Sequence, residues 1–328
     1  MNNDVQEVRT ILAPTNPVPP GTLAGAAHEP AARAARDRII ASDERPRRRR
    51  WTPRLVAVGG LAVTIAAGTT VAQNIGGTDE HGRPRTAIPG LPAAPAANAK
   101  EALTRAAYAA ERRPFTAPRP DQWVYIKTRY KDVNHKKKKY GPFTPKSPAT
   151  TYTQERWTRA DGKQTADFEG GKLVIAPTGG TSIPNDYATV STLPRDPDAL
   201  LAWAKKQAGP HQDPVFSLLG AMLVHSLVPP AQEAAIYRAL AKTPGVTLTK
   251  RTSDAEGRPA LSLSSAAEGW IREEVLLDPS TYAYRGHRTV VIKDHSDEHM
   301  SYKKGTVADQ SARLTITVVN RPGQRPHS

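Results

Sequence analysis

One five-residue stretch has residue types and spacing that could bind a catalytic metal. His295, Glu298 and His299 fit the pattern H-x-x-E-H, in which two histidines on one helical face bind zinc and the glutamate polarises a water molecule. The context does not favour a helix, because residues 294–298 are polar and lie between two strand-like segments. We therefore expect a solvated hairpin loop, with adventitious metal binding and a metal-dependent hydrolase as the alternatives.

The remaining composition excludes several other chemistries. The chain of 328 residues has no cysteine, which excludes a disulfide scaffold, a thiolate metal site, a cysteine nucleophile and a lipoprotein anchor. No glycine-rich phosphate loop follows a predicted strand, and no serine lies in a G-x-S-x-G motif. We expect no catalytic residues, no cofactor and a non-enzymatic protein.

Other conspicuous side chains are predicted to be structural. His225 lies in an apolar segment and is expected to be a hydrogen-bonded core residue. The tryptophans within predicted elements are expected in the core; they are Trp123, Trp157, Trp203 and Trp270.

A run of four lysines forms a dense basic loop between two predicted strands; it comprises Lys136, Lys137, Lys138 and Lys139. We expect a flexible, solvated loop, and the alternative is a contact with an anionic envelope polymer or with lipid head groups. Tyr140 is the one neighbouring aromatic residue, which is too few for base stacking, so no nucleic-acid partner is expected.

Residues 55–72 form the strongest local pattern in the chain. They run for 18 positions without a charge, close to the ~20 that a helix needs to cross a bilayer. Basic residues and one tryptophan stand before this segment: Arg47, Arg48, Arg49, Arg50, Trp51 and Arg54. Positive charge on one flank predicts that residues 1–54 are cytoplasmic and that the chain after residue 72 is extracytoplasmic, in the cell envelope. A buried globular helix and a cleaved signal peptide are the alternatives.

Composition divides the chain into four parts. Residues 1–54, with ten arginines and six acidic residues, are too few to bury a core and are expected to be a partly disordered tail. Residues 55–72 are the predicted transmembrane helix, and residues 73–97 form a linker rich in proline, glycine and alanine. Residues 98–328 are the predicted extracytoplasmic domain. The net charge is +15, of which +4 lies in residues 1–54 and +11 in the remainder.

Periodicity within the last part predicts strands, then helices, then strands. Helices are expected over residues 97–112, 196–207, 213–228 and 230–242, where apolar residues recur at helical spacing and proline or aspartate marks the ends. Strands are expected over residues 122–130, 151–159, 164–168, 172–176, 246–252, 260–264, 270–277, 284–293, 300–303 and 312–319. This order predicts an α+β fold with an antiparallel sheet packed on helices, preceded by one transmembrane helix.

Several segments carry a resemblance to a known family. They are DVQEVRTIL near the N-terminus, the proline-rich stretch, the arginine run, the span, the linker, WVYIK, ERW and EVLLDPSTYAYRG. In this arrangement the chain resembles uncharacterised actinobacterial single-pass membrane proteins that are often encoded beside extracytoplasmic-function sigma factors. The resemblance implies a role in envelope signalling. The order of elements in residues 98–328 is also similar to the curved half-barrel of periplasmic lipoprotein carriers, which implies an apolar cleft.

Three functions follow as hypotheses. The first is a membrane-anchored extracytoplasmic sensing or interaction protein whose cytoplasmic segment contacts a sigma factor or another regulatory protein. The second is a tethered carrier of lipid or another apolar ligand. The third is the metal-dependent hydrolase at His295 and His299.

Overall fold

The structure is a computed structural model that describes residues 88–92, 94–135, 141–178, 183–208 and 214–326. The predicted tail, span and most of the linker lie outside the described residues, together with Arg47, Arg48, Arg49, Arg50, Trp51 and Arg54. The lysines from Lys136 to Lys139 lie outside them as well. In the described ranges, no helix has the length and apolar character needed to cross a membrane.

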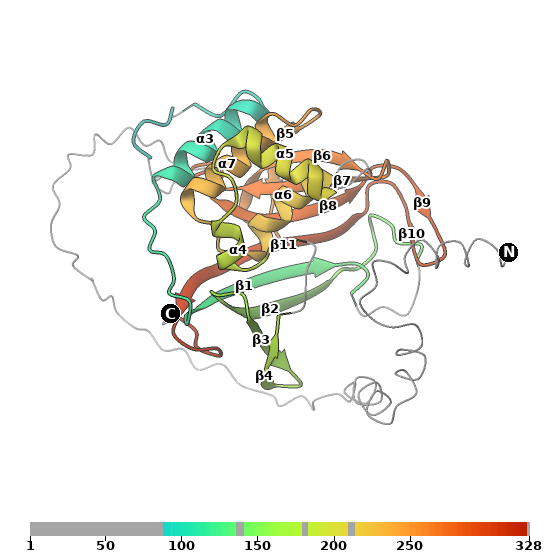
Figure 1. Cartoon of the computed structure of the whole chain (residues 1–328). Helices are drawn as coiled ribbons and strands as arrows, with labels where there is room; N and C mark the ends of the chain where they lie inside the picture. The colour runs from blue at the N-terminus through green and yellow to red at the C-terminus, as the bar shows by residue number, and fades with distance from the viewer. Residues whose placement is uncertain (1–87, 93, 136–140, 179–182, 209–213, 327–328) are drawn as a thin grey trace, which may run out of the picture. The chain divides into compact units, whose positions relative to one another are not determined.

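A single antiparallel sheet of nine strands organises the domain (Figure 1). Its strands follow the order β4-β3-β2-β1-β11-β8-β7-β6-β5, so two meanders are joined where β11 pairs with both β1 and β8. The strands are β1 (Trp123–Asp132), β2 (Thr150–Arg159), β3 (Gln164–Glu169), β4 (Lys172–Pro177), β5 (Thr247–Ser253), β6 (Pro259–Ala267), β7 (Ile271–Leu277), β8 (Tyr284–Val291) and β11 (Val307–Val319). A separate hairpin pairs β9 (His295–Ser296) with β10 (Ser301–Tyr302).

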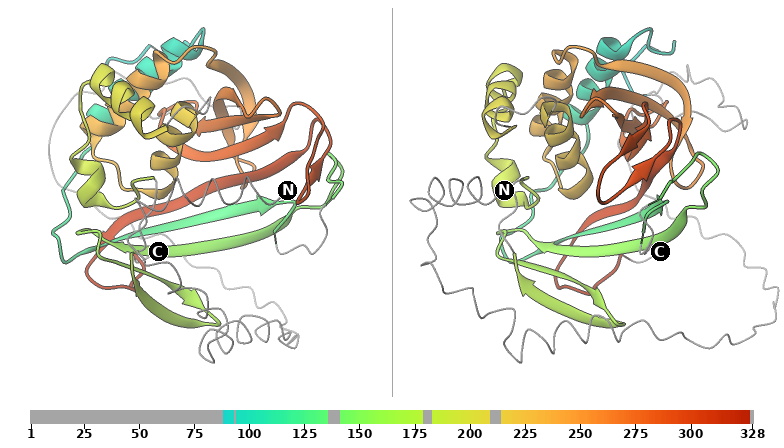
Figure 2. Two further views of the ribbon diagram at one scale, coloured as in Figure 1. Left: turned by 45° about the vertical axis from the view of Figure 1, so that its right-hand side comes forward. Right: turned by 90° about the vertical axis from the view of Figure 1, so that its right-hand side faces the viewer.

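Helices cover one face of this sheet, which curves around them (Figure 2). They are α3 (Ala99–Glu111), α4 (Tyr187–Ser191), α5 (Pro197–Ala208), α6 (Pro214–His225) and α7 (Pro230–Ala241). Their apolar faces share one core with Leu261 and Leu263 of β6 and with Val275 and Leu277 of β7. The α+β class and the antiparallel sheet packed on helices are therefore confirmed.

Local rules explain how the helices begin and end. The Asn98 side chain caps α3 by accepting the Glu101 backbone N–H at 2.9 Å, and Asp196 caps α5 by accepting the Ala199 N–H at 2.8 Å. Pro229 and Pro230 lie just before and at the start of α7, where no intrahelical donor is needed. These short-range signals explain why most predicted helix ends agree with the structure within about two residues, whereas α6 ends at His225, three residues before the predicted end at residue 228.

Some expectations were incomplete. The five-residue helix α4 was not predicted, and β11 begins at Val307 rather than at residue 312. Trp123 and Trp157 are buried as expected, whereas Trp203 and Trp270 are partly buried and pack against the edges of two apolar clusters.

A tight turn after β7 fastens the sheet to α3. The Asp278 carboxylate accepts the Ser280 and Thr281 backbone N–H groups at 2.7 and 2.8 Å and pairs with Arg285. The Tyr282 hydroxyl at the end of this turn accepts a hydrogen bond from Arg105 of α3 at 3.0 Å. Burial alone would raise the pKa of Asp278, but the hydrogen bonds from Ser280, Arg285 and the turn lower that pKa to about 2.

We predict that the Asp278 turn contributes acid-dependent stability. A carboxyl group with a depressed folded pKa stabilises the fold above its unfolded pKa, and this contribution is lost as the pH falls from about 4 toward about 2. Urea unfolding should show a loss of about 2 kcal/mol over this window. The Asp278→Asn variant should be less stable at pH 7 and should lack this part of the pH dependence; an unchanged slope would contradict the assignment.

We also predict that any side chain at position 286 destabilises the protein. The Gly286 backbone lies so close to β11 that a Cβ atom would stand 2.2 Å from the Ser311 carbonyl oxygen, which is backbone and cannot rotate away. Gly286→Ala should destabilise the protein by about 3 kcal/mol in chemical denaturation. Gly220→Ala in α6 is the control, because its backbone is also outside the left-handed region and its added Cβ would meet only a methyl group of Val275, at 3.3 Å.

Candidate functional site

The H-x-x-E-H segment adopts a hairpin, as the polar context predicted. His295 lies in β9, where its ring stacks on Trp270 with centroids 4.0 Å apart, and its Nε2 lies 3.0 Å from Asp297 Oδ2. The Asp297 carboxylate also accepts the backbone N–H of His299 at 2.7 Å. The helical face that would align His295 with His299 is therefore not formed. In the described part of the chain, no three metal-ligating side chains gather around a common point.

The sheet face toward the helices contains a different concentration of polar groups. In β1, the inward side chains are Ile126, Thr128 and Tyr130, which line the space under the end of α6. Cross-strand pairing places Ile126 opposite Ile316 of β11 and opposite Arg156 of β2. This alternation builds a half-polar floor below the helices.

An irregularity in β11 determines which of its residues join this floor. Lys127 pairs with Thr315, but the next residue, Thr128, pairs with Arg313, so Leu314 is an extra residue in the register. Such a bulge reverses which side chains face inward on either side of it. Arg313 consequently faces the helices, although strict alternation from Ile316 would direct it outward.

The C-terminal end of α6 rests on Arg313. The Arg313 guanidinium donates through Nη2 to the carbonyl of Leu223 and, at 2.9 Å, to that of Val224. Both carbonyls belong to the last turn of the helix, where cations interact favourably with the helix dipole. The face of the Tyr284 ring lies 4.4 Å from the same guanidinium.

A cavity of about 390 Å³ opens between α6, α7, β11 and the segment that follows α3. We call it the α6–β11 cavity. Its lining residues are Arg113, Pro114, Phe115, Thr116, Leu223, Ser226, Leu227, Val228, Glu233, Arg313, Ile316, Thr317 and Val318. The volume lies at the lower end of the range of about 300–1,000 Å³ that is typical of small-molecule sites.

One ion pair lies in the wall of this cavity. The buried Glu233 carboxylate lies 2.5 Å from Arg113 Nη2 and accepts a hydrogen bond from the Tyr237 hydroxyl at 3.2 Å. Arg113 also donates to the Val228 carbonyl at 3.2 Å, which fixes the entry of α7 against the segment after α3. Burial raises the pKa of Tyr237 well above its ordinary value, and Glu233 adds to this shift, so the hydroxyl stays protonated.

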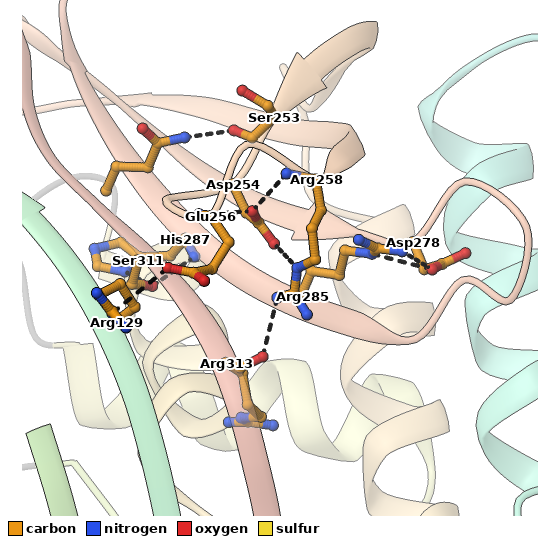
Figure 3. Close-up of polar contacts among 11 residues, drawn as sticks. Arg129, Ser253, Asp254, Glu256, Arg258, Asp278, Arg285, His287, Ser311 and Arg313 are labelled. Atoms are coloured by element: carbon orange, nitrogen blue, oxygen red, sulfur yellow. Dashed lines mark hydrogen bonds and ion pairs between the residues drawn. The ribbon is translucent and has the colours of Figure 1, made fainter. Parts of the chain in front are cut away.

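A second polar cluster lies on the same sheet face, around His287 of β8 (Figure 3). His287 Nε2 lies 2.7 Å from Asp309 Oδ1, and Nδ1 lies 3.0 Å from the Ser311 hydroxyl. The three residue types are those of a hydrolytic triad. However, Ser311 is 1% exposed, and its Oγ already accepts the His287 backbone N–H at 2.9 Å. The arrangement therefore fastens β8 to β11 instead of presenting a nucleophile.

His225 is the last residue of α6 and lies near both Arg313 and the polar cluster around His287. Its side chain is only partly buried, so it is not a core residue, and it borders a small gap beside Arg156. Burial of the ring, together with the charges of Arg156, His287 and Arg313, lowers the pKa of His225 to about 4. The imidazole is therefore neutral at pH 7 and adds no charge to this region.

A further ion pair lies on the opposite face of the sheet. Asp254 pairs with Arg258 at 2.7 Å, and Arg258 Nη2 donates to the Arg313 carbonyl at 3.0 Å (Figure 3). Figure 3 shows the Arg313 guanidinium extending away from Arg258. The Arg313 carbonyl therefore accepts a hydrogen bond from Arg258 on one face of the sheet, while its side chain contacts α6 on the other.

Sequence reasoning missed the residues of both inward clusters. Arg113, Glu233 and Arg313 are widely separated in the chain and belong to no motif. His287 and Asp309 lie in segments predicted as an ordinary strand and a loop. The feature that could have drawn attention to Arg313 is an arginine that directly precedes the alternating segment from Leu314 to Val319.

We predict that the His287–Asp309 pair stabilises the domain near neutral pH. Burial would lower the pKa of His287, but Asp309 raises it; burial would raise the pKa of Asp309, but His287 lowers it. The raised histidine contributes stability that is lost as the pH rises through its folded pKa, and the depressed aspartate contributes stability that is lost on acidification below 3.8.

Asp309→Asn should therefore lower the His287 pKa in an NMR titration and reduce stability by about 1 kcal/mol at pH 6, a small value because both side chains are about 30% exposed. Asp121→Asn, which removes a fully surface carboxylate, serves as the control. An unchanged His287 titration in Asp309→Asn would contradict the pairing.

Comparison with known proteins adds little to this geometry. No family model matches the sequence, and no curated protein matches it. Among solved structures, the chain is similar to "Crystal structure of MucB in complex with MucA(peri)" at 14% identity and a TM-score of 0.27, covering 70% of this chain and 59% of that chain. It is also similar to "The complex structure of Pseudomonas aeruginosa MucA/MucB" at 15% identity and a TM-score of 0.25, covering 70% and 58%. The chain spans less than two thirds of these structures, and similarity at this level supports no functional argument.

Proposed function

We propose that the protein is a non-enzymatic, single-pass membrane protein whose extracytoplasmic domain binds a small ligand and acts as a sensing or interaction module. In this proposal, residues 1–54 lie in the cytoplasm and contact a sigma factor or another regulatory protein. The observation that carries the binding role is the α6–β11 cavity, a cavity of about 390 Å³ that is lined by both charged and apolar side chains.

The membrane topology is supported by the charge distribution of the sequence. The uncharged segment 55–72 follows five closely spaced arginines and precedes a flank without basic residues up to position 82. Hydrocarbon disfavours charge, and basic residues are retained on the cytoplasmic side. The proposed orientation therefore places the described domain outside the cell.

Binding explains the inward polar groups better than catalysis does. A nucleophile must reach its substrate, whereas the Ser311 hydroxyl beside His287 is buried and already hydrogen-bonded. At the cavity, Glu233 and Arg113 neutralise one another, and His225 is uncharged at pH 7. These groups are arranged to fix structure and to recognise a bound group.

The link to transcriptional control is supported by the sequence of the tail and by the resemblance to proteins encoded beside sigma factors. The tail contains ten arginines and six acidic residues, a composition that suits a surface for a charged protein partner. The lysine run Lys136–Lys139 would add a contact with anionic envelope polymers or lipid head groups outside the cell.

A tethered carrier of an apolar ligand is the second candidate, and the curvature of the sheet around its helices favours it (Figure 2). A carrier of large lipids needs a wide apolar space. The α6–β11 cavity instead has three charged lining residues, Arg113, Glu233 and Arg313, and a volume suited to a small molecule. We therefore rank this function below the sensing or interaction role.

Orientation can be tested by moving the positive charge. A C-terminal reporter that is active only outside the cell should be active on the natural chain. It should lose most of this activity when Arg45, Arg47, Arg48, Arg49, Arg50 and Arg54 are changed to serine and Gln73 and Asn74 to arginine, because the positive flank then lies on the other side of the span. Changing the four lysines from Lys136 to Lys139 to serine lowers the net charge by the same amount and should have no effect.

The proposed contact between residues 1–54 and a regulatory protein is tested separately, by crosslinking of the full-length chain in cells. Photocrosslinking residues placed within positions 1–54 should capture one cytoplasmic regulatory protein reproducibly, and the same residues placed at 98–110 should not capture it. A reporter that is inactive on the natural chain would disprove the topology, and a tail without any crosslinked partner would disprove the regulatory role.

A further inference from the structure

We propose that the α6–β11 cavity binds a small ligand with an anionic head group, a carboxylate or a phosphate, on a short apolar body, and that the head group pairs with Arg313. This inference deepens the proposed binding function and rests on it. It follows from the charge balance of the cavity, from the hydrogen bonds of Arg313 and from the distribution of apolar side chains.

The formal charges of the residues that line the cavity do not cancel. The charged residues are Arg113, Glu233 and Arg313. Glu233 is paired with Arg113 at 2.5 Å and also stabilises the charge of Arg313 without contacting it, so the three lining charges sum to one net positive charge. Burial lowers the pKa of Arg313, but an arginine keeps its proton under nearly all conditions.

Several arginines of this sheet have a carboxylate partner that Arg313 lacks, although Arg156 of β2, which borders a separate small gap, forms no ion pair among the described residues either. Arg258 pairs with Asp254, Arg285 with Asp278, and both Arg272 and Arg288 with Glu274. Within the described ranges, no carboxylate forms an ion pair with Arg313. A buried charge without a counter-charge is costly, and an anionic ligand would remove this cost.

The hydrogen bonds of Arg313 leave part of its guanidinium available. Nη2 donates to the Leu223 and Val224 carbonyls, and Nε is buried without a partner, so Nη1, which forms no hydrogen bond among the described residues, is the nitrogen left for a ligand. A guanidinium presents its donors in a rigid fork that matches carboxylate and phosphate oxygens. The contacts with α6 hold the group in place, which reduces the entropy lost when a ligand binds.

Apolar side chains next to Arg313 would accommodate the rest of the ligand. They are contributed by the end of α6 and the loop after it, Leu223, Leu227 and Val228, and by β11, Ile316 and Val318. With about 390 Å³ available, the ligand is a small amphipathic anion rather than a lipid with several chains.

The test is a binding titration followed by ligand-observed NMR, with the full-length chain in lipid nanodiscs and protein-free nanodiscs as the blank. Hexanoate and hexyl phosphate are the anionic probes, and they distinguish a carboxylate from a phosphate head group. Hexanol and hexylammonium are the neutral and cationic probes of equal length. We expect saturable binding of at least one anion and about tenfold weaker binding of the alcohol and the amine.

Variants locate the site. Arg313→Gln should weaken binding of the anion by about tenfold or more, while Lys250→Gln, which removes an exposed charge on β5, should leave it unchanged. Leu227→Trp enlarges an apolar side chain of the cavity lining, keeps Arg313 and should also weaken binding. If Arg313→Gln does not fold, Arg313→Lys, which keeps the charge but loses the fork, replaces it and should weaken binding less.

Each outcome decides the inference. Equal binding of hexanol and hexanoate would overturn the role of charge but would leave the cavity as a ligand site, so the proposed function would stand. Anion binding that neither Arg313→Gln nor Leu227→Trp changes would overturn the site. Absence of binding by every probe would overturn the inference, whereas the topology and the regulatory partner are tested independently by the reporter and crosslinking experiments.

Discussion

An extra residue in β11 determines which side chains face the helices. On both sides of Leu314 the strand pairs regularly with β1, but the residues that point inward change from even to odd numbers. Ile316 and Val318 lie inward on one side of the bulge, and Arg313, Ser311 and Asp309 on the other. The strand therefore supplies an apolar wall to the cavity and, after the bulge, the charged and polar groups that hold the neighbouring elements.

The consequences of this bulge extend to the helices and to β8. Arg313 reaches the carbonyls at the end of α6, so a strand side chain completes the hydrogen bonds of a helix that ends in the interior. Ser311 and Asp309 bind His287, and this contact draws β8 close enough to β11 that only glycine fits at position 286. The same strand thus joins the two meanders of the sheet and positions the helices above them.

The interior that results contains more charge than a simple apolar core. The shared core of α3, α5, α6, α7, β6 and β7 is apolar, whereas the region under the end of α6 contains Glu233, His287, Asp309 and Arg313. Most of these groups are paired, because an unpaired charge in the interior would be costly. Of these four described groups, Arg313 is the one without an ion pair, and its position in the cavity wall connects the fold to the proposed binding function.

Much of the architecture could be predicted from the sequence, because strand alternation, helical periodicity and capping are local properties. The four longer helices, most strands and the turn at Asp278 were identified from residues close together in the chain, such as Asp196 before Pro197. The hairpin at His295 was predicted in the same way, from the polar residues around it. The candidate site could not be predicted, because it joins Arg113, Glu233 and Arg313, which span 200 positions of the chain, and depends on a one-residue shift in pairing. Local sequence determined which segments become strands and helices; only tertiary packing decided on which side of β11 the arginine lies, because register is set by the pairing of distant strands.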